Sequence, residues 1–450
     1  MALKNKYQRE KQQYTYDSGR TWIDVSPANY RRGRLIEAGS DDCNTIEWRE
    51  VTGSWFCIGF NDTQYRWVTV SGEYVCVGYN KYSIKKKQQS VDGGTTWTDV
   101  SPIETRQGDL IEANSADCGY VPPTPGDYEN QYLTFEAIED GTFTFTGTSS
   151  NSLSYSLDDG QTWTALASGT ASPTVTAGNK IMWKGTCTPS DNGIGSFSST
   201  GTFNAYGNTM SIVHGDNFQN STTISGNQFS SLFNSTKVVN AENLVLPATT
   251  LANYCYYKMF YGCTSLVNAP ALPSMTLANW SYGGMFSGCT SLVTAPELPA
   301  TTLADSCYGG MFDGCTSLVN APTLPATTLA YNCYQYMFRG CTGLVTAPEL
   351  PATTLADYCY NYMFRGCTSL VNAPTLPATT LADYCYNYMF RGCSSLNYIK
   401  CLATDISASN CLNIWVDGVS TTGTFVKNAN MESWTTGNNG IPTGWTVVTE

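Results

Sequence analysis

The side chains of this chain that are best suited to acid–base chemistry are aspartates set among serines and threonines in three short segments. These segments read TYDSGRTW at residues 15–22, SVDGGTTW at residues 90–97 and SLDDGQTW at residues 156–163. An aspartate can serve as a catalytic acid, base or nucleophile when a second carboxylate or a histidine lies beside it. His214 is the only histidine of the chain, and no serine lies in a G-x-S-x-G context. These two facts disfavour Ser-His-Asp and Cys-His catalysis.

The same three segments have a structural explanation. Their common pattern, S-x-D-x-G-x-T-W with Thr15 in place of the first serine, resembles the Asp-box of sialidases and other β-propeller glycosidases. In that motif the acidic and hydroxyl side chains bond the backbone of a tight turn, the glycine takes a conformation that other residues resist, and the tryptophan packs beneath. The resemblance therefore implies that six residues clasp hairpins: Asp17, Trp22, Asp92, Trp97, Asp158 and Trp163.

Three such segments do not make a sialidase. That family has a six-bladed propeller with an arginine triad and a Tyr/Glu nucleophile pair, whereas the three segments here are unevenly spaced and lie in otherwise different sequence. Carboxylate pairs such as Asp41 and Asp42 lie in polar loops, where they are expected to be solvated. We therefore predict no catalytic residue and no enzymatic activity, with a glycan-cleaving enzyme as a distant alternative.

Composition excludes several further classes. Charged residues make up only 13% of the 450 residues, and the net charge of −12 disfavours nucleic acid as a partner. No run of 18 apolar residues occurs and the N-terminal sequence lacks an apolar leader, so we expect neither membrane insertion nor a secretory signal. The 18 cysteines contain no C-x-x-C pair and only one histidine accompanies them, which argues against zinc. No metal and no cofactor are expected.

Two different units organise the N-terminal half. A tandem repeat occupies residues 1–120, because Trp22-Ile-Asp24-Val-Ser-Pro27 returns as Trp97-Thr-Asp99-Val-Ser-Pro102. Alternating runs such as YRWVTV predict β-strands within it. The segment VPPTPGD at residues 121–127 predicts a linker, since its prolines disfavour both helix and central strand. Residues 128–216 alternate strongly in hydropathy and predict a small β-sandwich-like module.

A second and shorter repeat dominates the C-terminal half. The unit MFxGCTSLVxAPxLPATTLAxxCYxx begins at Met259, Met285 and Met311 and recurs with the same period until Met389. We expect a solenoid over residues 217–425 and a C-terminal cap over residues 426–450, because an array needs atypical ends. Leu266 and Val267 should begin a parallel strand that ends at Pro270 and Pro273. An apolar stripe through Leu381, Cys385, Tyr388, Met389 and Cys393 predicts a short helix ended by Gly392.

Two cysteines occur in each repeat, at a constant spacing, except where Ser281 replaces one. A ladder of small buried thiols explains this pattern best. Disulfides between neighbouring repeats stay open as the alternative, because stacked repeats would bring equivalent cysteines close together.

The repeat, with its MF-x-GC-x-x-L core followed by a Val-containing strand that ends in proline, resembles the leucine-rich repeats of the BspA type. Such repeats occur in surface proteins of gut and oral bacteria and in some of their tailed phages. Met in place of Ala, the length of the period and the LVNAPxLP strand depart from the family form. The resemblance covers about residues 230–425 and implies a mainly β, multi-domain chain that ends in a leucine-rich-repeat solenoid with short helical segments.

Positions that change between repeats are expected to face solvent and to bind a ligand. Seven residues are the candidates: Tyr261, Arg339, Arg365, Arg391, Tyr336, Tyr362 and Tyr388. Tyrosines in such a stripe could stack against sugar rings or peptide. The alternative is that half of a wider tyrosine set belongs to the core with hydroxyls at the surface, without indicating which half: Tyr256, Tyr334, Tyr336, Tyr360, Tyr362, Tyr386 and Tyr388.

These features predict a non-enzymatic virion protein, namely a tail-fibre or receptor-binding component of a tailed bacteriophage, assembled in the host cytoplasm. The solenoid would adhere to a host-surface glycan or protein, and the mildly basic N-terminal region would contact other virion proteins. The resemblance to fibres implies a homo-oligomer such as a trimer. A bacterial cell-surface adhesin of the BspA type is the alternative.

Overall fold

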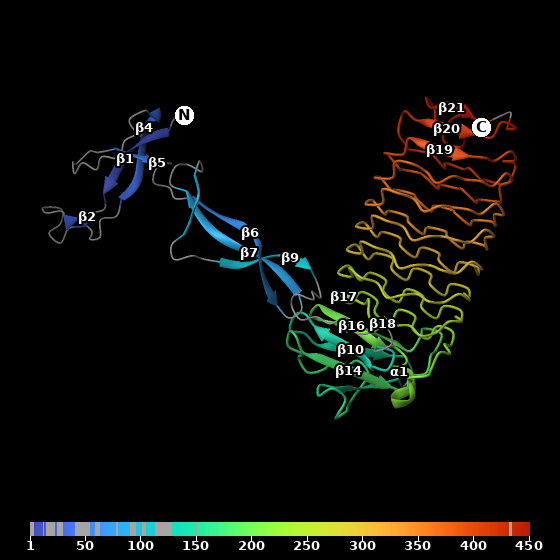
Figure 1. Cartoon of the computed structure of the whole chain (residues 1–450), viewed down its shortest axis with the longest axis horizontal. Helices are drawn as coiled ribbons and strands as arrows, with labels where there is room; N and C mark the ends of the chain where they lie inside the picture. The colour runs from blue at the N-terminus through green and yellow to red at the C-terminus, as the bar shows by residue number, and fades with distance from the viewer. Residues whose placement is uncertain are drawn as a thin grey trace. The chain divides into compact units, whose positions relative to one another are not determined.

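The computed structural model describes residues 4–11, 13–14, 23–24, 30–40, 55–58, 64–77, 80–90, 96–100, 105–112, 128–148, 151–431 and 434–450. The chain divides into two compact units, Met1–Pro122 and Pro123–Glu450 (Figure 1). The described chain is mainly β, and its two helices are the four-residue α1 (Ser211–His214) and the three-residue η3 (Gly215–Asn217). Among the described residues, no helix is long and apolar enough to cross a bilayer.

The first unit contains antiparallel strands that recur in two copies along the chain. In the first copy β1 (Lys4–Lys11) pairs with β4 (Tyr30–Ser40) and β5 (Trp55–Ile58), and β2 (Gln13–Tyr14) pairs with β3 (Ile23–Asp24). In the second copy β7 (Asn80–Ser90) pairs with β6 (Gln64–Val77), β8 (Thr98–Asp99) and β9 (Thr105–Glu112). Gln13 opposes Asp24 and Gln88 opposes Asp99, so the register is the same in both. The linker predicted at residues 121–127 lies outside the described residues.

The second unit begins with two facing sheets. The larger runs in the order β13-β12-β14-β10-β16-β17, with β18 also paired to β16, and the smaller contains β11 and β15. Their bounds are β10 (Leu133–Ala137), β11 (Phe143–Gly147), β12 (Leu153–Ser156), β13 (Thr164–Leu166), β14 (Lys180–Gly185), β15 (Gly195–Ser199), β16 (Phe203–Asn208), β17 (Val238–Asn240) and β18 (Leu244–Val245). Phe135 of β10 lies 5.2 Å from Phe143 and 4.8 Å from Phe197, between ring centroids. An aromatic core therefore joins the two sheets.

The module of two sheets continues directly into the coils that follow it. Strand β16 pairs in antiparallel fashion with β10 on one side and in parallel fashion with β17 and β18 on the other. One continuous cluster of buried apolar side chains runs from Leu133 to Trp445. The boundary predicted between residues 216 and 217 thus lies inside a single contact unit, and the module covers the first coil of the array.

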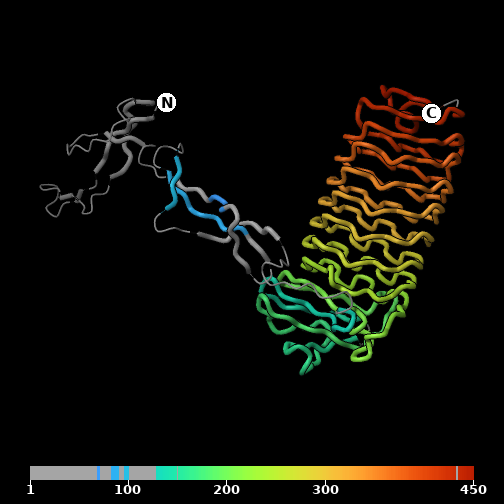
Figure 2. Tube along the Cα trace, viewed as in Figure 1, coloured from blue at the N-terminus to red at the C-terminus, as the bar shows by residue number. Residues whose placement is uncertain are grey.

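From β17 onward the chain winds in evenly stacked coils (Figures 1 and 2). Equivalent residues of neighbouring coils lie one repeat period apart, as the parallel bridges of Asn320 with Thr294 and with Thr346 show. Each coil therefore places the same sequence position beside its counterparts in the coil before and the coil after.

Prolines decide where full strands form in this array. Pro270 and Pro273 have no N–H to donate, and the coils that carry APxLP form isolated bridges, such as the one at Asn268, in place of the predicted parallel strand. The sequence NYIKCLA of the later coil has no proline. There β19 (Tyr398–Cys401) pairs with β20 (Thr424–Lys427), and β20 pairs with β21 (Thr446–Thr449).

The helices predicted within the repeats are absent, because residues 218–431, all of them described, contain only turns and extended segments. Met389 N–H donates to the carbonyl of Tyr386 in the same coil, whereas Phe390 N–H donates to the Trp415 carbonyl of the next coil. This alternation repeats along the segment and satisfies its backbone donors without a helix. Every fourth residue has positive φ, as at Tyr384 (57°), Tyr388 (56°) and Gly392 (77°). Gly392 is thus left-handed, but it ends a turn and not a helix.

The inward side chains of the coils form columns along the array. Phe312 and Phe338 are fully buried and nearly parallel with ring centroids 5.7 Å apart, and Tyr308 and Tyr334 are 5.9 Å apart. The Cys341 thiol donates to the Phe312 carbonyl at 3.1 Å, one coil earlier. Burying one such Phe, Met or Leu side chain contributes about 1.5–3 kcal/mol. The repeated columns therefore hold successive coils together.

Candidate functional site

The third Asp-box-like segment closes the turn between β12 and β13. Asp158 accepts hydrogen bonds from the Ser156 hydroxyl at 2.7 Å, from Thr162 N–H at 2.9 Å and from the Thr162 hydroxyl at 2.6 Å. Gly160 N–H donates to Ser156 Oγ at 2.9 Å. The hydrogen bonds from Thr162, and then that from Ser156, stabilise the carboxylate and lower the pKa of Asp158 to about 2. Asp158 is therefore an ionised structural acceptor at neutral pH.

Trp163 ties this turn to Tyr132, just before β10, and to Lys184 of β14. Its indole N–H donates to the Gly160 carbonyl at 3.0 Å, and its ring packs against Tyr132 with centroids 4.9 Å apart. The Lys184 ammonium lies 4.4 Å from the indole centroid and pairs with Asp216 at 2.8 Å.

The carboxylate of Asp216 also accepts the Tyr132 hydroxyl at 2.7 Å. Desolvation and that hydrogen bond raise the pKa of Tyr132 to about 12, and the hydrogen bond from Lys184 lowers the pKa of Asp216. The cluster is thus a fixed link whose charges are paired.

The other two Asp-box-like segments are described only in part. Asp17, Trp22 and Asp92 lie outside the described residues, and Trp97 is half-buried just before β8. His214 is exposed at the end of α1. Among the described residues, no group of three or more His, Cys, Asp or Glu side chains is placed to hold a metal ion.

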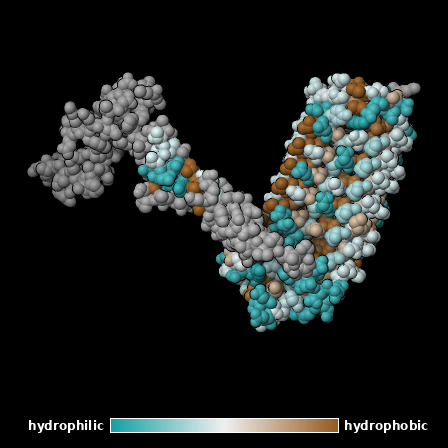
Figure 3. Space-filling model, viewed as in Figure 1, coloured by the Kyte–Doolittle hydropathy of each residue, from teal (hydrophilic) through white to brown (hydrophobic). Residues whose placement is uncertain are grey.

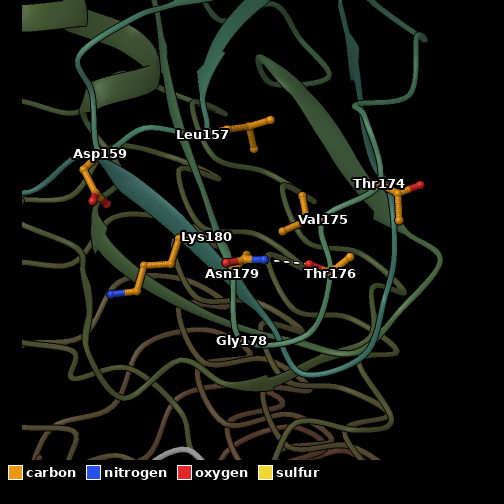
Figure 4. Close-up of a pocket in the computed structure, with 8 residues that line it drawn as sticks. All are labelled: Leu157, Asp159, Thr174, Val175, Thr176, Gly178, Asn179 and Lys180. Atoms are coloured by element: carbon orange, nitrogen blue, oxygen red, sulfur yellow. Dashed lines mark hydrogen bonds between the residues drawn. The ribbon is translucent and has the colours of Figure 1, made fainter.

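A surface hollow of about 480 Å³ lies beside the third turn (Figure 4). Asp159 and Lys180 lie on one side of it, and the backbone from Thr174 to Thr176 lies on the other. Asn179 crosses its floor and donates to Thr176 Oγ1 at 2.6 Å. A second hollow, of about 450 Å³, is lined mainly by alanines and prolines of the first two complete repeats. Neither hollow is lined by a histidine; Asp159 is the one carboxylate of the first, and Glu242 and Glu297 both line the second.

Six of the seven candidate binding residues lie together on the outer side of the linked turns, which we call the turn face. Tyr336, Tyr362 and Tyr388 form a tyrosine column, with centroids 4.9 Å and then 4.6 Å apart. Arg339, Arg365 and Arg391 run beside it, each with its guanidinium 4.6–5.5 Å from the tyrosine ring of its own coil. Tyr362 and Tyr388 stack face to face, 11° from parallel, and Tyr336 is tilted by 38° against Tyr362, so the facing sides of these rings are largely covered.

Two of the three arginines are neutralised by aspartates of adjoining coils. Arg339 Nε donates to Asp313 at 2.9 Å, and Arg391 Nε donates to Asp417 at 3.1 Å. The hydrogen bonds to Asp313 raise the pKa of Arg339. Arg365 lies between these pairs, and it has no carboxylate partner among the described residues.

Tyr261 stands apart from the other candidates. It is exposed, occupies the arginine position three coils before Arg339, and lies 5.2 Å from the Lys258 ammonium. Tyr256, Tyr334, Tyr360 and Tyr386 are fully buried, so these four belong to the core and cannot reach a ligand.

The turn face also contains aromatic residues that the sequence did not single out. Tyr358 and Tyr384 stack with centroids 4.5 Å apart, and Tyr254 and Trp280 stack with centroids 6.2 Å apart. Each lies four residues before the position that the tyrosine column occupies in its coil. The sequence feature that could have revealed them is variation at this position, which is Ser or Asn in other coils. The core positions of the repeat hardly vary.

A separate apolar row follows the side of the coils that carries the prolines. Its members are exposed valines, one in each of the five repeats that begin at Met259 to Met363: Val267, Val293, Val319, Val345 and Val371. The space-filling view shows apolar side chains following the coils along one edge (Figure 3). These valines occupy the same position of successive coils, and each follows a buried leucine and precedes Asn or Thr.

The 14 cysteines from Cys187 to Cys411 are buried free thiols. Burial is the main cause that raises their pKa, to about 12 for Cys393 and about 11 for Cys263. Each of the later MF-x-GC thiols donates to the phenylalanine carbonyl of the preceding coil, at 3.0–3.2 Å. They act as small core side chains in the structure.

Comparison of the chain with protein-family models, curated proteins and solved structures found no match.

Proposed function

We propose that this chain is a non-enzymatic adhesion protein that binds a host-surface glycan or protein through the turn face. In this proposal the stacked coils are a leucine-rich-repeat solenoid of the BspA type. The observation that carries it is the contrast between inward and outward positions. Met, Phe and Leu recur inside every complete repeat, whereas the outward position of Tyr362 is occupied by Lys258, Gly284, Gly310 or Ile414 in other coils.

The choice of tyrosine in the tyrosine column supports a binding role. Tyr336, Tyr362 and Tyr388 have φ of 56–59°, a region that tyrosine rarely adopts and that costs about 1–2 kcal/mol per residue. Gly284 and Gly310 take the same conformation without that cost, so the coil itself does not require tyrosine. Positive φ recurs at every fourth residue of the coils, so the support comes from the choice of tyrosine at this position and not from φ itself. Tyr and Arg are the residues enriched at binding surfaces.

Within this proposal the chain is a tail-fibre or receptor-binding component of a tailed bacteriophage, with a bacterial cell-surface adhesin as the second candidate. The resemblance of the repeat to bacterial and phage surface repeats supports both. Immunogold labelling with an antibody against residues 230–425 separates them. Label at the distal tip of purified phage particles supports the first candidate, and label on uninfected cells supports the second.

Cell binding tests the adhesive role. Fluorescently labelled full chain is incubated with a panel of gut bacterial isolates, and bound protein is measured by flow cytometry. Changing Tyr362→Gly and Tyr388→Gly together should lower binding at least tenfold, because it removes two rings of the tyrosine column. The coil should stay folded, since glycine already occupies this position with the same φ at Gly284 and Gly310. The control Thr323→Glu alters an exposed position that is Glu297 and Glu349 in neighbouring repeats, and it should leave binding unchanged.

Two results would count against this function. Equal binding by the double variant and the unaltered chain would remove the turn face from adhesion. Reproducible hydrolysis of a sialoside or polysaccharide, lost when one carboxylate is changed, would show that the chain is an enzyme.

A further inference from the structure

The charges of the turn face are arranged in an order that no single coil reveals. The arginine column, counted over five successive coils, reads Asp313, Arg339, Arg365, Arg391 and Asp417. The two outer arginines each bond the aspartate next to them, at 2.9 and 3.1 Å. One positive charge is therefore left over, and it belongs to the middle arginine.

The free guanidinium of Arg365 is held in place without being neutralised. It lies 5.5 Å from the Tyr362 ring centroid, in a contact that stabilises a cation but supplies no negative charge. The arginines on both sides are paired with aspartates, so Arg365 is the one guanidinium of this column left to bind an external anion. Arg365 is half-buried, so part of its planar fork of donors is open to solvent.

We propose that Arg365 is the anchor of a subsite for the carboxylate of an acidic glycan, built of uronic-acid units. This inference rests on the proposed adhesive function and names its ligand class. A guanidinium binds a carboxylate through two parallel N–H···O bonds, and one free guanidinium accepts one such group.

The groups around Arg365 favour a sugar chain over a peptide. The hydroxyls of Tyr362 and Tyr388 have no hydrogen-bond partner among the described residues, and both side chains are half-buried and so partly open to solvent. Every backbone N–H from Tyr358 to Cys367 is bonded, either within its own coil or to the next coil. No N–H is left there to bond a peptide added as a strand. Tyrosine hydroxyls and one cation instead match the hydroxyls and the carboxylate of a uronate.

The stacking of the tyrosines limits how a sugar ring can bind. Tyr362 and Tyr388 are 11° from parallel with centroids 4.6 Å apart, so each covers the face of the other. A sugar cannot insert between them and must lie across the ring edges, along the column. That path leads from Tyr362 over Arg365 to the adjoining coils and suits an extended chain.

Binding of defined oligomers to the full chain tests the proposal. The probes are hexagalacturonate, its neutral methyl ester and hexaglutamate, and affinity is measured by isothermal titration calorimetry at low and moderate salt. The unaltered chain should bind hexagalacturonate about 10- to 100-fold more tightly than the methyl ester, as expected for one charge-assisted pair. Added salt should weaken the binding of hexagalacturonate and leave the binding of its neutral methyl ester unchanged.

Variants locate the subsite. Arg365→Ala should abolish the preference for the acid over the ester, and Arg365→Lys should restore part of it, since lysine keeps the charge and loses the fork. Lys258→Ala removes one positive charge from the same face, four coils away, and should change nothing. Circular dichroism of each variant verifies that the fold is intact.

Three results would overturn the assignment. They are equal binding of hexagalacturonate by Arg365→Ala and the unaltered chain, tighter binding of hexaglutamate than of hexagalacturonate, and no binding of any probe. The cell-binding measurement tests the adhesive function separately. If the unaltered chain binds cells through the tyrosine column, the adhesive function stands even when no acidic ligand is bound.

Discussion

The stacking of phenylalanines one coil apart leads to a quantitative prediction about stability. Phe312 and Phe338 are adjacent in the phenylalanine column, whereas Phe390 lies three coils beyond Phe312. Replacing each by leucine keeps most of the apolar volume and removes the ring. The two double variants, Phe312→Leu with Phe338→Leu and Phe312→Leu with Phe390→Leu, differ only in whether the rings touch.

The expected magnitudes come from counting ring contacts. Phe338 contacts Phe312 and Phe364, each with centroids 5.7 Å apart. At about 0.5–1.5 kcal/mol for each pair, losing one ring lowers the free energy of unfolding by about 1–3 kcal/mol. The adjacent double variant loses three contacts, because one is shared, and the distant double variant loses four. The adjacent pair should therefore be coupled by about 0.5–1.5 kcal/mol, and the distant pair by less than about 0.5 kcal/mol.

Equilibrium unfolding in urea, followed both by far-ultraviolet circular dichroism and by tryptophan fluorescence, measures these free energies. The two signals must give the same transition, since long repeat arrays can lose two-state behaviour. Thr342→Ala, an exposed turn residue, is the control and should change stability by less than about 0.5 kcal/mol. Coupling of the distant pair as strong as that of the adjacent pair would refute direct contact between successive coils.

Three further predictions concern single residues. Ser281→Cys should raise the free energy of unfolding, measured in urea, by about 1–2 kcal/mol, because the Ser281 hydroxyl is buried without a hydrogen-bond partner and other coils have cysteine there. A lower free energy of unfolding would contradict this. Cys393 should stay unlabelled by iodoacetamide in the native chain at pH 8, since a pKa of about 12 leaves about one thiolate in ten thousand. Peptide mapping measures the labelling, and a Cys393 labelled within minutes would disprove its burial. Asp158 has a pKa lowered from 3.8 to about 2, so its carboxylate stabilises the fold fully above pH 4 and this stabilisation is lost as the pH falls toward 2. The melting temperature of Asp158→Asn should therefore approach that of the unaltered chain in that range. A constant difference in melting temperature from pH 7 to pH 2 would be inconsistent with the lowered pKa.

The repeat length allowed the alignment of side chains to be predicted, because any coil of constant length places equivalent positions side by side. The turn geometry was harder to predict. Leu381, Cys385, Met389 and Cys393 are spaced by four, which approximates the period of a helix, but here it reflects a chain that reverses at every fourth residue. Tyr384 and Tyr388 concealed this reversal, since tyrosine gives no sign of positive φ.

The binding surface was predictable as a set of positions but not as an arrangement of charges. Variation between repeats indicated that Arg339, Arg365 and Arg391 face outward. Their different electrostatic states depend on Asp313 and Asp417, which belong to other coils and become neighbours only when the coils stack. Prolines were informative in another way: they predicted a strand end, and their missing N–H groups also kept most coils from forming strands at all.

Oxidative cross-linking of tyrosines tests most directly the central claim that equivalent residues of successive coils form one surface column. Exposure of the full chain to light with a ruthenium photocatalyst and persulfate joins tyrosines that are accessible and in contact, and mass spectrometry of the digested monomer identifies the pairs. Tyr362 with Tyr388 and Tyr358 with Tyr384, at 4.6 and 4.5 Å, should be the main products, and Tyr388→Gly should remove the first while leaving the second. Cross-links within residues 250–420 that join mostly tyrosines at non-equivalent positions of the repeat would contradict the stacked coils and the binding face built on them.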